Sequence, residues 1–447
     1  MTSQRITDAL VSATDTRRVV IDEGAHAQVG PVFAELFPGA TAQLVADGTT
    51  FAIAGAQVLA SLTAAGVPTA EPYVLPARPR PYAAYEGVAP IAALLEDRDT
   101  IALVVGSGTL NDLAKRASAE RDRPYLVVAT AASMDGYGAF GASLTLEGYK
   151  QTLSCPAPRA VVADLDVLVD APADMTASGY GDLLGKVTAG ADWMLADAAG
   201  VEAIDPHAFA LVQQPLRASI AAPSALAAGD RAALEALVEG LIMSGIAMQV
   251  YAASRPSSGS EHQFSHLWEM EGLGRDLDPP LSHGFKVGLG SIAVAALYER
   301  LLTVDLTTLD RDRAVAAWPT FEELTASAHA AHPLLGDVAV DQLKAKYVDA
   351  QGLAHRLELL ATAWPTLQGQ LAAQLMGPAT LADMLKAAGC PTTPQEIGLD
   401  VAAFKATYRR SQMIRARYTV LDVAAEFGIL EDLVEDLFAP AGYWGGL

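Results

Sequence analysis

The stretch Thr100-Ile-Ala-Leu-Val-Val-Gly-Ser-Gly-Thr-Leu-Asn-Asp112 decides the predicted fold. Its first six residues form an apolar run, which is typical of a strand buried on both faces of a sheet. Two glycines follow, and residues 110–119 then repeat apolar side chains at helical spacing. A buried strand, a glycine turn and a helix make up one unit of an α/β fold, whose strands pair in parallel.

The same alternation of strands and helices extends outward from this stretch through the first third of the chain. Further strands or extended segments are predicted at residues 18–22, 43–47, 72–75, 125–129 and 161–169. Helices are predicted at residues 28–36, 56–65, 88–95 and 110–119. This pattern predicts a Rossmann-like parallel sheet with helices on both faces.

From about residue 180 the sequence changes to long segments rich in Ala and Leu. Helices are predicted at residues 183–199, 231–253, 286–302, 342–363, 382–388 and 401–428. The predicted fold class is therefore α/β plus all-α. We expect a dinucleotide-binding domain at residues 1–170 and a helical domain at residues 171–447.

Composition narrows the class of protein. The 447 residues include 30 Lys and Arg against 52 Asp and Glu, a net charge of −22 that argues against nucleic acid and membrane surfaces as partners. Cys155 and Cys390 are too few for a disulfide framework. The N-terminus lacks the apolar core of a signal peptide, and the apolar helical stretch at residues 240–253 is too short to cross a bilayer. These features predict a cytoplasmic protein without membrane insertion.

Two segments are candidates for binding a nucleotide. Gly106 and Gly108 follow a buried strand, where glycine lets the backbone approach a phosphate, and Asn111 and Asp112 open the next helix. The alternative is an ordinary capped turn, because the full dinucleotide fingerprint is missing. Asp47 ends another strand, where an acid can bind the adenosine ribose of NAD. The residue alone favours a solvated turn aspartate.

Small residues follow the strand at residues 125–129, in Ala129-Thr-Ala-Ala-Ser-Met-Asp-Gly136. Ligands of open α/β sheets bind at the carboxyl ends of strands, so this segment is also a candidate site. Asp135 is equally well explained as a turn residue or as a polar ligand of a substrate.

The histidines indicate a metal site. His262 and His266 are four residues apart, so they share one face of a helix, and His283 precedes another helix. Two such segments with a carboxylate, for which Asp182 is the candidate, can bind a divalent metal. The alternatives are a surface or core histidine and, for Asp182, a helix cap.

Four motifs resemble the sn-glycerol-1-phosphate dehydrogenase family of the iron-type alcohol dehydrogenase and glycerol dehydrogenase superfamily. They are Ser133-Met-Asp-Gly-Tyr137, Gly181-Asp-Leu-Leu-Gly-Lys186, Ser258-Gly-Ser-Glu-His-Gln-Phe-Ser-His266 and Ser282-His-Gly-Phe-Lys-Val-Gly-Leu-Gly290. The segments Pro391-Thr-Thr-Pro-Gln-Glu-Ile-Gly398 and Ile414-Arg-Ala-Arg-Tyr-Thr-Val-Leu-Asp422 resemble its longer bacterial branch, which is linked to sugar metabolism. The resemblance implies a dehydroquinate synthase-like fold.

The resemblance also implies roles for individual residues. It implies metal ligation by Asp182, His262 and His283, and substrate contacts from Asp135, Asp182 and His266. His266 and Asp135 are the predicted catalytic residues. Because His266 lies one turn from a ligand and histidine titrates near neutrality, we hypothesise that it is a proton relay; the alternative is only a hydrogen bond to a substrate hydroxyl. The implied cofactor contacts are Asp47, Gly106, Gly108, Thr109, Leu110, Asn111, Asp112, Thr130, Ala131, Ala132 and Ser133.

One position departs from the family pattern. Ala139 stands where the family usually has a serine, which removes one expected cofactor contact; Ser143 is close in the sequence. Lys150, Lys186 and Arg255 are weak candidates for binding a substrate phosphate, because each is also explained as a surface or helix-end charge.

The implied reaction is the metal-dependent, NAD(P)-dependent interconversion of dihydroxyacetone phosphate and sn-glycerol 1-phosphate. NAD is favoured over NADP, and the metal is Zn or Ni, with Fe(II) used by relatives. A homo-oligomer, dimeric or larger, is expected. The alternatives are a dehydrogenase of glycerol or another polyol, and a non-catalytic relative.

Overall fold

The computed structural model describes residues 3–146 and 149–447, which fold into two compact units. The sheet unit comprises Met1–Leu183, Ala210–Ser254 and Ala387–Gly389. The helical unit comprises Leu184–Phe209, Arg255–Lys386 and Cys390–Leu447. Since the units interleave along the chain, a division into domains 1–170 and 171–447 stays a prediction.

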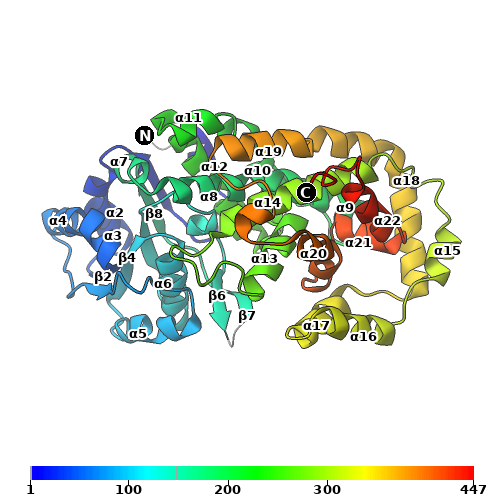
Figure 1. The fold of residues 1–447 in the computed structure, drawn as a ribbon. Helices are drawn as coiled ribbons and strands as arrows, with labels where there is room; N and C mark the ends of the chain where they lie inside the picture. Colours follow the sequence, from blue (N-terminus) through cyan, green and yellow to red (C-terminus); the bar gives the residue numbers. More distant parts are fainter. Residues whose placement is uncertain (1–2, 147–148) are drawn as a thin grey trace. The chain divides into compact units, whose positions relative to one another are not determined.

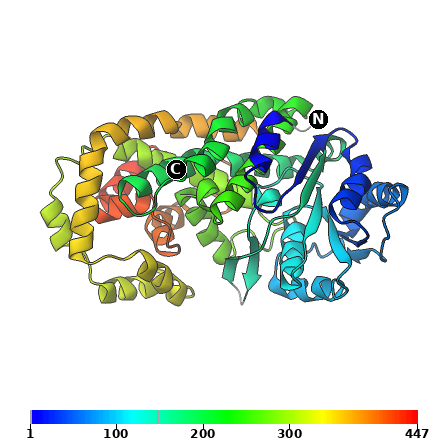
Figure 2. The same ribbon diagram turned by 180° about the vertical axis from the view of Figure 1, so that it is seen from behind.

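A parallel sheet forms the centre of the sheet unit, and its strands lie side by side in Figures 1 and 2. In the described part of the chain the strand order is β1-β8-β5-β4-β2-β3. The bounds are β1 Arg18–Asp22, β8 Ala160–Asp164, β5 Tyr125–Ala129, β4 Thr100–Gly106, β2 Thr41–Asp47 and β3 Tyr73–Leu75. The predicted parallel sheet is confirmed.

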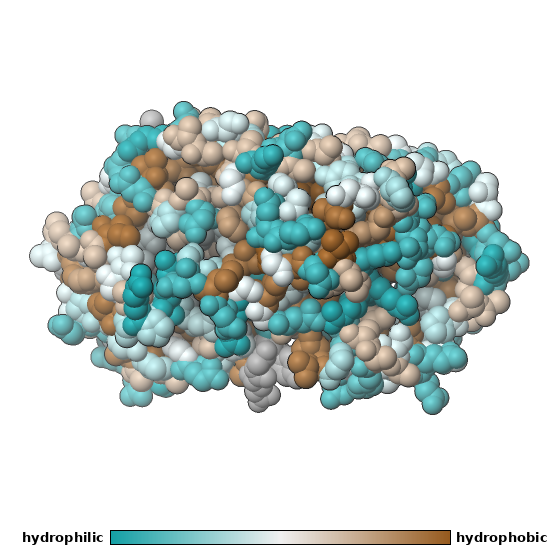
Figure 3. Space-filling model, viewed as in Figure 1, coloured by the Kyte–Doolittle hydropathy of each residue, from teal (hydrophilic) through white to brown (hydrophobic). Residues whose placement is uncertain are grey.

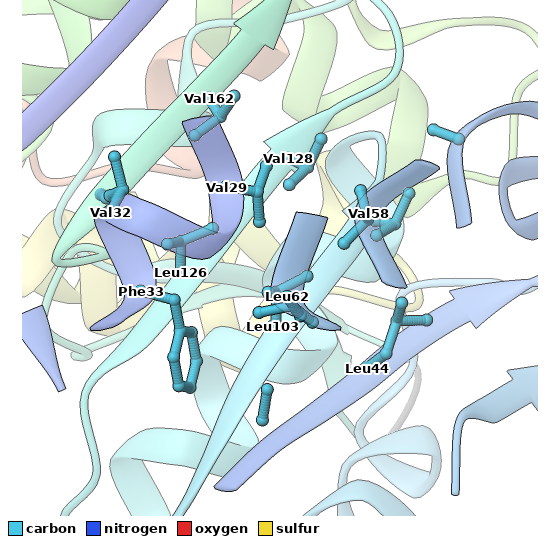
Figure 4. Close-up of a cluster of buried hydrophobic side chains, with 14 of the residues drawn as sticks. Val29, Val32, Phe33, Leu44, Val58, Leu62, Leu103, Leu126, Val128 and Val162 are labelled. Carbon is cyan, nitrogen blue, oxygen red and sulfur yellow. The ribbon is translucent and has the colours of Figure 1, made fainter. Parts of the chain in front are cut away.

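Both faces of this sheet are buried. On one face, Leu44, Leu103 and Leu126 pack against apolar side chains of α2 (Val29–Leu36) and α4 (Ala56–Ala64) (Figure 4). On the other face, Val45, Val104 and Val127 are fully buried, and α6 (Gly108–Glu120) contacts β2, β4 and β5. The strands are apolar throughout because alternate residues enter two different cores.

The remaining elements of the sheet unit lie around this core. Its other helices are α1 (Gln4–Leu10), α3 (Gly48–Thr50), α5 (Val88–Ala93), α7 (Leu165–Val169), α10 (Pro206–Ser219, which begins in the helical unit), α11 (Pro223–Ala227) and α12 (Arg231–Tyr251). Helix α8 (Ala173–Leu184) ends this unit's first segment, and an antiparallel hairpin joins β6 (Ala142–Leu146) to β7 (Tyr149–Leu153). The hairpin was not predicted from the sequence.

The helical unit contains no named strand in its described residues. Its helices are α9 (Lys186–Ala198), α13 (Ser260–Met270), α14 (His283–Leu301), α15 (Arg311–Ala316), α16 (Phe321–Ala331), α17 (Gly336–Lys346), α18 (Ala350–Gln374), α19 (Pro378–Ala387), α20 (Val401–Met413), α21 (Val420–Glu426) and α22 (Leu430–Phe438). Trp193, Trp268 and Trp364 are each 1% exposed and anchor its core. The predicted helical region is confirmed.

Several predicted boundaries were wrong for local reasons. The strand predicted at residues 161–169 ends at Asp164, whose side chain accepts a hydrogen bond from the Asp166 N–H and starts α7. The helix predicted at residues 342–363 is broken before α18, where Asp349 caps the Gly352 N–H. The helix predicted at residues 401–428 is divided into α20 and α21, because Thr419 and Asp422 form a capping box.

The apolar helix α12 is longer than the predicted stretch at residues 240–253. It has 21 residues, and its most apolar window has a mean hydropathy of 1.4. By length and composition it could cross a membrane, but 72% of that window is buried inside the protein, as in a core helix. On the face shown in Figure 3, hydrophilic residues lie among scattered hydrophobic ones.

Candidate functional site

The carboxyl edge of the sheet collects the residues predicted to bind a nucleotide. β5, β4 and β2 are neighbours and end at Ala129, Gly106 and Asp47. The strands are parallel, so the segments that follow them leave the sheet at the same edge. Residues 106–112, residues 130–133 and Asp47 therefore share one edge of the sheet unit.

The glycine turn leads directly into α6. A Cβ added to Gly106 would lie 2.5 Å from Cδ1 of Leu110, and one added to Gly108 would lie 3.1 Å from the Met134 side chain. Ser107 makes no side-chain cap. The N–H groups of Thr109 and Leu110 lie in the first turn, where a helix offers no backbone partner, so they can bind an anion.

The side chains at the next two positions have structural partners. The Asn111 amide donates to the carbonyl oxygen of Gly136 (3.2 Å) and accepts from the Tyr125 hydroxyl (3.0 Å). The Asp112 carboxylate accepts from the Ser143 N–H (3.2 Å), and burial raises its pKa. These side chains connect α6 to the segment that follows β5.

Asp47 caps the helix that follows its strand, whereas the residue alone favoured a solvated turn aspartate. Its Oδ1 accepts from the N–H groups of Thr49 and Thr50, both at 2.8 Å. Among the described residues no hydrogen bond to Oδ2 is present, so that oxygen can still accept from a ribose hydroxyl.

Asp135 is held by two neighbouring helices. Its N–H donates to Oδ2 of Asp182 on α8 (3.0 Å), and its Oδ2 accepts from the Ser244 hydroxyl on α12 (2.8 Å). Asp182 is fully buried. The sequence did not reveal Ser244, because it is 109 residues away from Asp135.

Glycines let both helices approach this segment. A Cβ added to Gly179 of α8 would lie 1.9 Å from the carbonyl oxygen of Ala132. One added to Gly245 of α12 would lie 3.0 Å from the Asp135 carbonyl oxygen. Neither helix could keep its position with a larger residue there, since these contacts are to backbone atoms.

Lys115 secures the turn after Asp135. Its buried ammonium donates to the carbonyl oxygens of Gly136 (2.9 Å), Ala139 (2.9 Å) and Gly141 (3.0 Å), and burial lowers its pKa. Ala139, which replaces the expected serine, is 4% exposed, and its carbonyl oxygen is one of the three that bind the Lys115 ammonium. Apart from its place in a predicted helix, no sequence signal pointed to Lys115.

Within the helical unit, α13 and α14 bring three histidines together. The ring centroids lie 5.3 Å apart for His262 and His283, 5.9 Å for His262 and His266, and 6.1 Å for His266 and His283. The predicted clustering of these three histidines agrees with this geometry.

Hydrogen bonds at Nδ1 distinguish these rings. His262 Nδ1 lies 2.7 Å from Glu261 Oε1, and His283 Nδ1 lies 2.8 Å from Glu269 Oε1. A carboxylate can only accept, so Nδ1 carries the proton in both rings and the Nε2 lone pair can bind a metal. His283 Nδ1 also lies 3.3 Å from the Ser265 hydroxyl.

His266 has the opposite arrangement. Arg415 Nε–H donates to His266 Nδ1 (3.2 Å), so the neutral ring carries its proton on Nε2. Burial and then the positive charge of Arg415 lower the pKa of His266 well below its ordinary value. A neutral imidazole that donates from Nε2 favours the hydrogen-bonding role over a relay that titrates near neutrality.

Asp192 fixes the start of the helix that carries two of these histidines. Its carboxylate accepts from the Ser260 N–H and hydroxyl (both 2.6 Å), the Tyr298 hydroxyl (2.7 Å) and the Val420 N–H (2.8 Å). Burial and the charge of Glu261 raise the pKa of Asp192 to about 6. This residue joins α9, α13, α14 and α21 but has no recognisable sequence signal.

The three weak phosphate candidates have different surroundings. Arg255 donates to the backbone oxygens of Tyr418 and Asp192, at 3.0 and 2.8 Å, so its hydrogen bonds connect two segments of the helical unit. Lys186 is fully buried on α9, and Lys150 is on the hairpin strand β7 of the sheet unit.

Comparisons with known proteins agree with this architecture. Residues 20–172 match a family model described as iron-containing alcohol dehydrogenase. A Bacillus licheniformis protein named glycerol-1-phosphate dehydrogenase, NAD(P)+, is 35% identical over 303 residues, which are 67% of this chain and 74% of the relative. A Halalkalibacterium halodurans protein of the same name is 35% identical over 257 residues, 57% of this chain and 64% of the relative. The chain thus spans slightly less than two thirds of the latter protein.

The structural neighbours show the same fold. A glycerol dehydrogenase from Schizosaccharomyces pombe matches with a TM-score of 0.59 at 16% identity, covering 95% of this chain and 91% of its own. A probable glycerol dehydrogenase from Sinorhizobium meliloti matches with a TM-score of 0.59 at 15% identity, covering 94% and 98%. At such identities the likeness concerns the fold alone.

Proposed function

This chain belongs to the glycerol-1-phosphate dehydrogenase family of iron-containing alcohol dehydrogenases, and from that membership we propose that it interconverts dihydroxyacetone phosphate and sn-glycerol 1-phosphate with NAD(P). The observation that carries the proposal is that the three histidines carry their protons on different ring nitrogens. His262 and His283 present metal-binding nitrogens, whereas His266 presents a proton donor. This combination suits reduction of a carbonyl group beside a cation.

We propose that Asp182, His262 and His283 hold the divalent metal. One carboxylate and two imidazoles suit Zn, Ni or Fe(II), and the donor set does not choose among them. Glu261 and Glu269 support the assignment, because histidine ligands usually donate their second N–H to a carboxylate. When bound, the cation would polarise the carbonyl oxygen of the substrate.

The proposed cofactor site is the carboxyl edge of the sheet. The N–H groups at the start of α6 would bind the pyrophosphate, with Gly106, Gly108 and Thr130–Ser133 leaving room for the dinucleotide. Oδ2 of Asp47 would accept from the ribose, which favours NAD over NADP. The nicotinamide would supply the hydride.

The chain's own polar groups would orient the substrate. Asp135, fixed by Ser244 and by the bond to Asp182, would accept from a substrate hydroxyl. His266 would donate from Nε2 to a second oxygen of the substrate. Because these side chains are already fixed by the protein, less entropy is lost when the substrate is oriented for reaction.

The test combines metal removal with two substrates. Protein treated with a chelator is resupplied with Zn, Ni, Fe(II) or Mn, and NADH oxidation is followed with dihydroxyacetone phosphate and with dihydroxyacetone. Activity that returns with a metal and prefers the phosphorylated substrate supports the proposal. Turnover of unphosphorylated polyols or ketones alone would instead indicate a polyol dehydrogenase.

We further propose a cytoplasmic homo-oligomer, dimeric or larger. Cys155 and Cys390 are both buried free thiols, as suits a reducing compartment. Light scattering of the purified chain measures its mass and tests the assembly.

A further inference from the structure

Two arginines lie beside the histidine cluster, on the segment between α20 and α21. Arg415 donates to His266 Nδ1 (3.2 Å), and Arg417 donates to the Ser258 hydroxyl (2.5 Å). Both side chains are partly buried. They belong to the helical unit, as do His266 and Ser258, so this arrangement lies within one compact body.

The charge of Arg415 is not balanced by a close acid among the described residues. Arg415 makes no ion pair among the described residues, and the acid whose charge acts on it is Glu269. Glu269 is already engaged, since its Oε1 lies 2.8 Å from His283 Nδ1 and 3.9 Å from Lys286 Nζ. Among the described residues, the guanidinium of Arg415 donates to His266 alone, although it carries five N–H groups.

Arg417 adds a second positive charge. Burial, followed by the charges of Arg255 and Arg415, lowers the pKa of Arg417 to about 10, while Glu202 and Glu261 act in the opposite direction. Arg255 is itself paired with Glu202 at 3.3 Å, so its charge is balanced within the protein. The charges of Arg415 and Arg417 lie close together in a partly buried setting, where a bound anion would stabilise them.

We propose that Arg415 and Arg417 bind the phosphate group of the substrate. The proposal rests on the proposed function and deepens it by assigning the subsite that selects a phosphorylated substrate. Guanidinium groups match phosphate oxygens with paired hydrogen bonds, which an ammonium group cannot do. In a chain with a net charge of −22, this local positive charge would attract the substrate dianion.

The bond to His266 connects this subsite to the reacting end of the substrate. In dihydroxyacetone phosphate, one methylene and one ester oxygen separate the carbonyl carbon from the phosphorus atom. Arg415 contacts His266 at Nδ1, whereas Nε2 of the same ring is the proposed donor to the substrate. One small molecule could therefore contact the ring and the guanidinium together.

The experiment compares two substrates in variants of the full, metal-loaded chain. The variants are Arg415→Met, Arg417→Met and Arg415→Lys. The matched control is Arg409→Met on α20, whose side chain is 58% exposed and pairs with Glu431 at 3.3 Å. We measure kcat and KM with dihydroxyacetone phosphate and with dihydroxyacetone, and inhibition by inorganic phosphate.

We expect each Met variant to lose roughly 100-fold in kcat/KM for dihydroxyacetone phosphate, about 2.7 kcal/mol, mainly through KM. In Arg417→Met, kcat/KM for dihydroxyacetone should change less than about threefold. Arg415→Met should also lower it, because Arg415 sets the proton position of His266. Inhibition by phosphate should weaken about tenfold in both Met variants, and Arg415→Lys should recover part of the loss. Arg409→Met should behave like the unmodified chain.

Equal losses on both substrates in Arg417→Met, or unchanged kinetics with the phosphorylated substrate in either Met variant, would overturn the proposal. Thermal unfolding identifies a variant that fails to fold, and Arg415→Lys then provides the comparison. If the unmodified chain does not reduce dihydroxyacetone phosphate, the proposed function fails separately. Calorimetry with inorganic phosphate then tests the subsite alone: binding that Arg415→Met weakens supports it, and binding that does not depend on either arginine contradicts it.

Discussion

The partner at Nδ1 determines what each histidine can offer at Nε2. Glu261 and Glu269 make His262 and His283 acceptors at Nε2, and Arg415 makes His266 a donor there. The sequence showed three similar side chains at suggestive spacing. Their difference depends on Glu269, 14 residues from His283, and on Arg415, 149 residues from His266.

Replacing a proposed ligand should remove the metal. We expect His262→Ala to lower the bound metal, measured by elemental analysis, and to reduce kcat at least about 100-fold, since polarisation of a carbonyl by a metal is worth several kcal/mol. His355→Ala on α18 is the control, because that histidine is exposed. Full metal content in His262→Ala would contradict the assignment.

Replacing His266 should lower the rate without changing its dependence on pH. Burial and the charge of Arg415 hold the pKa of His266 well below its ordinary value, so its ring is neutral from pH 7 to pH 9. No proton is gained or lost by this ring across that range. We expect His266→Ala to reduce kcat roughly 100-fold with an unchanged pH profile between pH 7 and 9. Loss of one limb of the profile would restore the relay hypothesis.

At the scale of elements, the packing of α8 on the segment after β5 can be tested with one methyl group. Gly179→Ala would place Cβ 1.9 Å from the Ala132 carbonyl oxygen, inside the proposed cofactor segment. We expect a loss of about 1–3 kcal/mol in unfolding free energy and weaker NADH binding, measured by fluorescence titration.

Gly369→Ala on α18 is the matched control for that substitution. A Cβ there meets nothing within 4 Å, so alanine should stabilise the helix by about 0.5–1 kcal/mol. NADH binding should stay the same. If Gly179→Ala behaved like Gly369→Ala, the close approach of α8 would not matter for the cofactor site.

Strands and helices with a regular pattern of apolar residues were predictable from the sequence. Helix boundaries that depend on a single polar capping residue were not. The strands at Arg18–Asp22 and Tyr125–Ala129 were predicted to the residue, because their apolar runs enter two cores. The breaks before α18 and α21 depend on caps within runs that are otherwise helical. The hairpin of β6 and β7 was missed because it lies outside the main sheet and alternates only weakly.

The candidate site was predicted only in part for a related reason. Motif spacing identified Asp135, Asp182 and the three histidines. The residues that orient them, including Lys115, Asp192 and Ser244, come from distant parts of the chain and are recognisable only through contacts. Sequence alone identifies chemistry-bearing groups more readily than the groups that fix their positions.

At the scale of the whole molecule, α12 connects parts of the sheet unit that are distant in sequence. Its Gln249 is 1% exposed and donates to the Thr16 hydroxyl (2.8 Å) and to the Gly138 carbonyl oxygen. The Gln249 carbonyl oxygen accepts from the N–H groups of Asp15 and Thr16, both at 3.2 Å. Residues 1–170 therefore depend on a helix that lies beyond them.

This dependence predicts that a fragment ending at residue 170 is not an independent domain. Without α8 and α12, residues 1–170 would leave the Gly138 and Thr16 partners of Gln249 unsatisfied and expose apolar surface that the helices cover. We expect fragment 1–170 to unfold without a cooperative transition and to bind NADH at least about tenfold more weakly than the full chain. Fragment 1–254, which retains both helices, is the control and should recover part of the binding.

Circular dichroism melting measures the cooperativity of unfolding, and fluorescence titration measures NADH binding. A cooperative melt and full NADH affinity in fragment 1–170 would show instead that the sheet and its first helices suffice, and would support the boundary expected from composition.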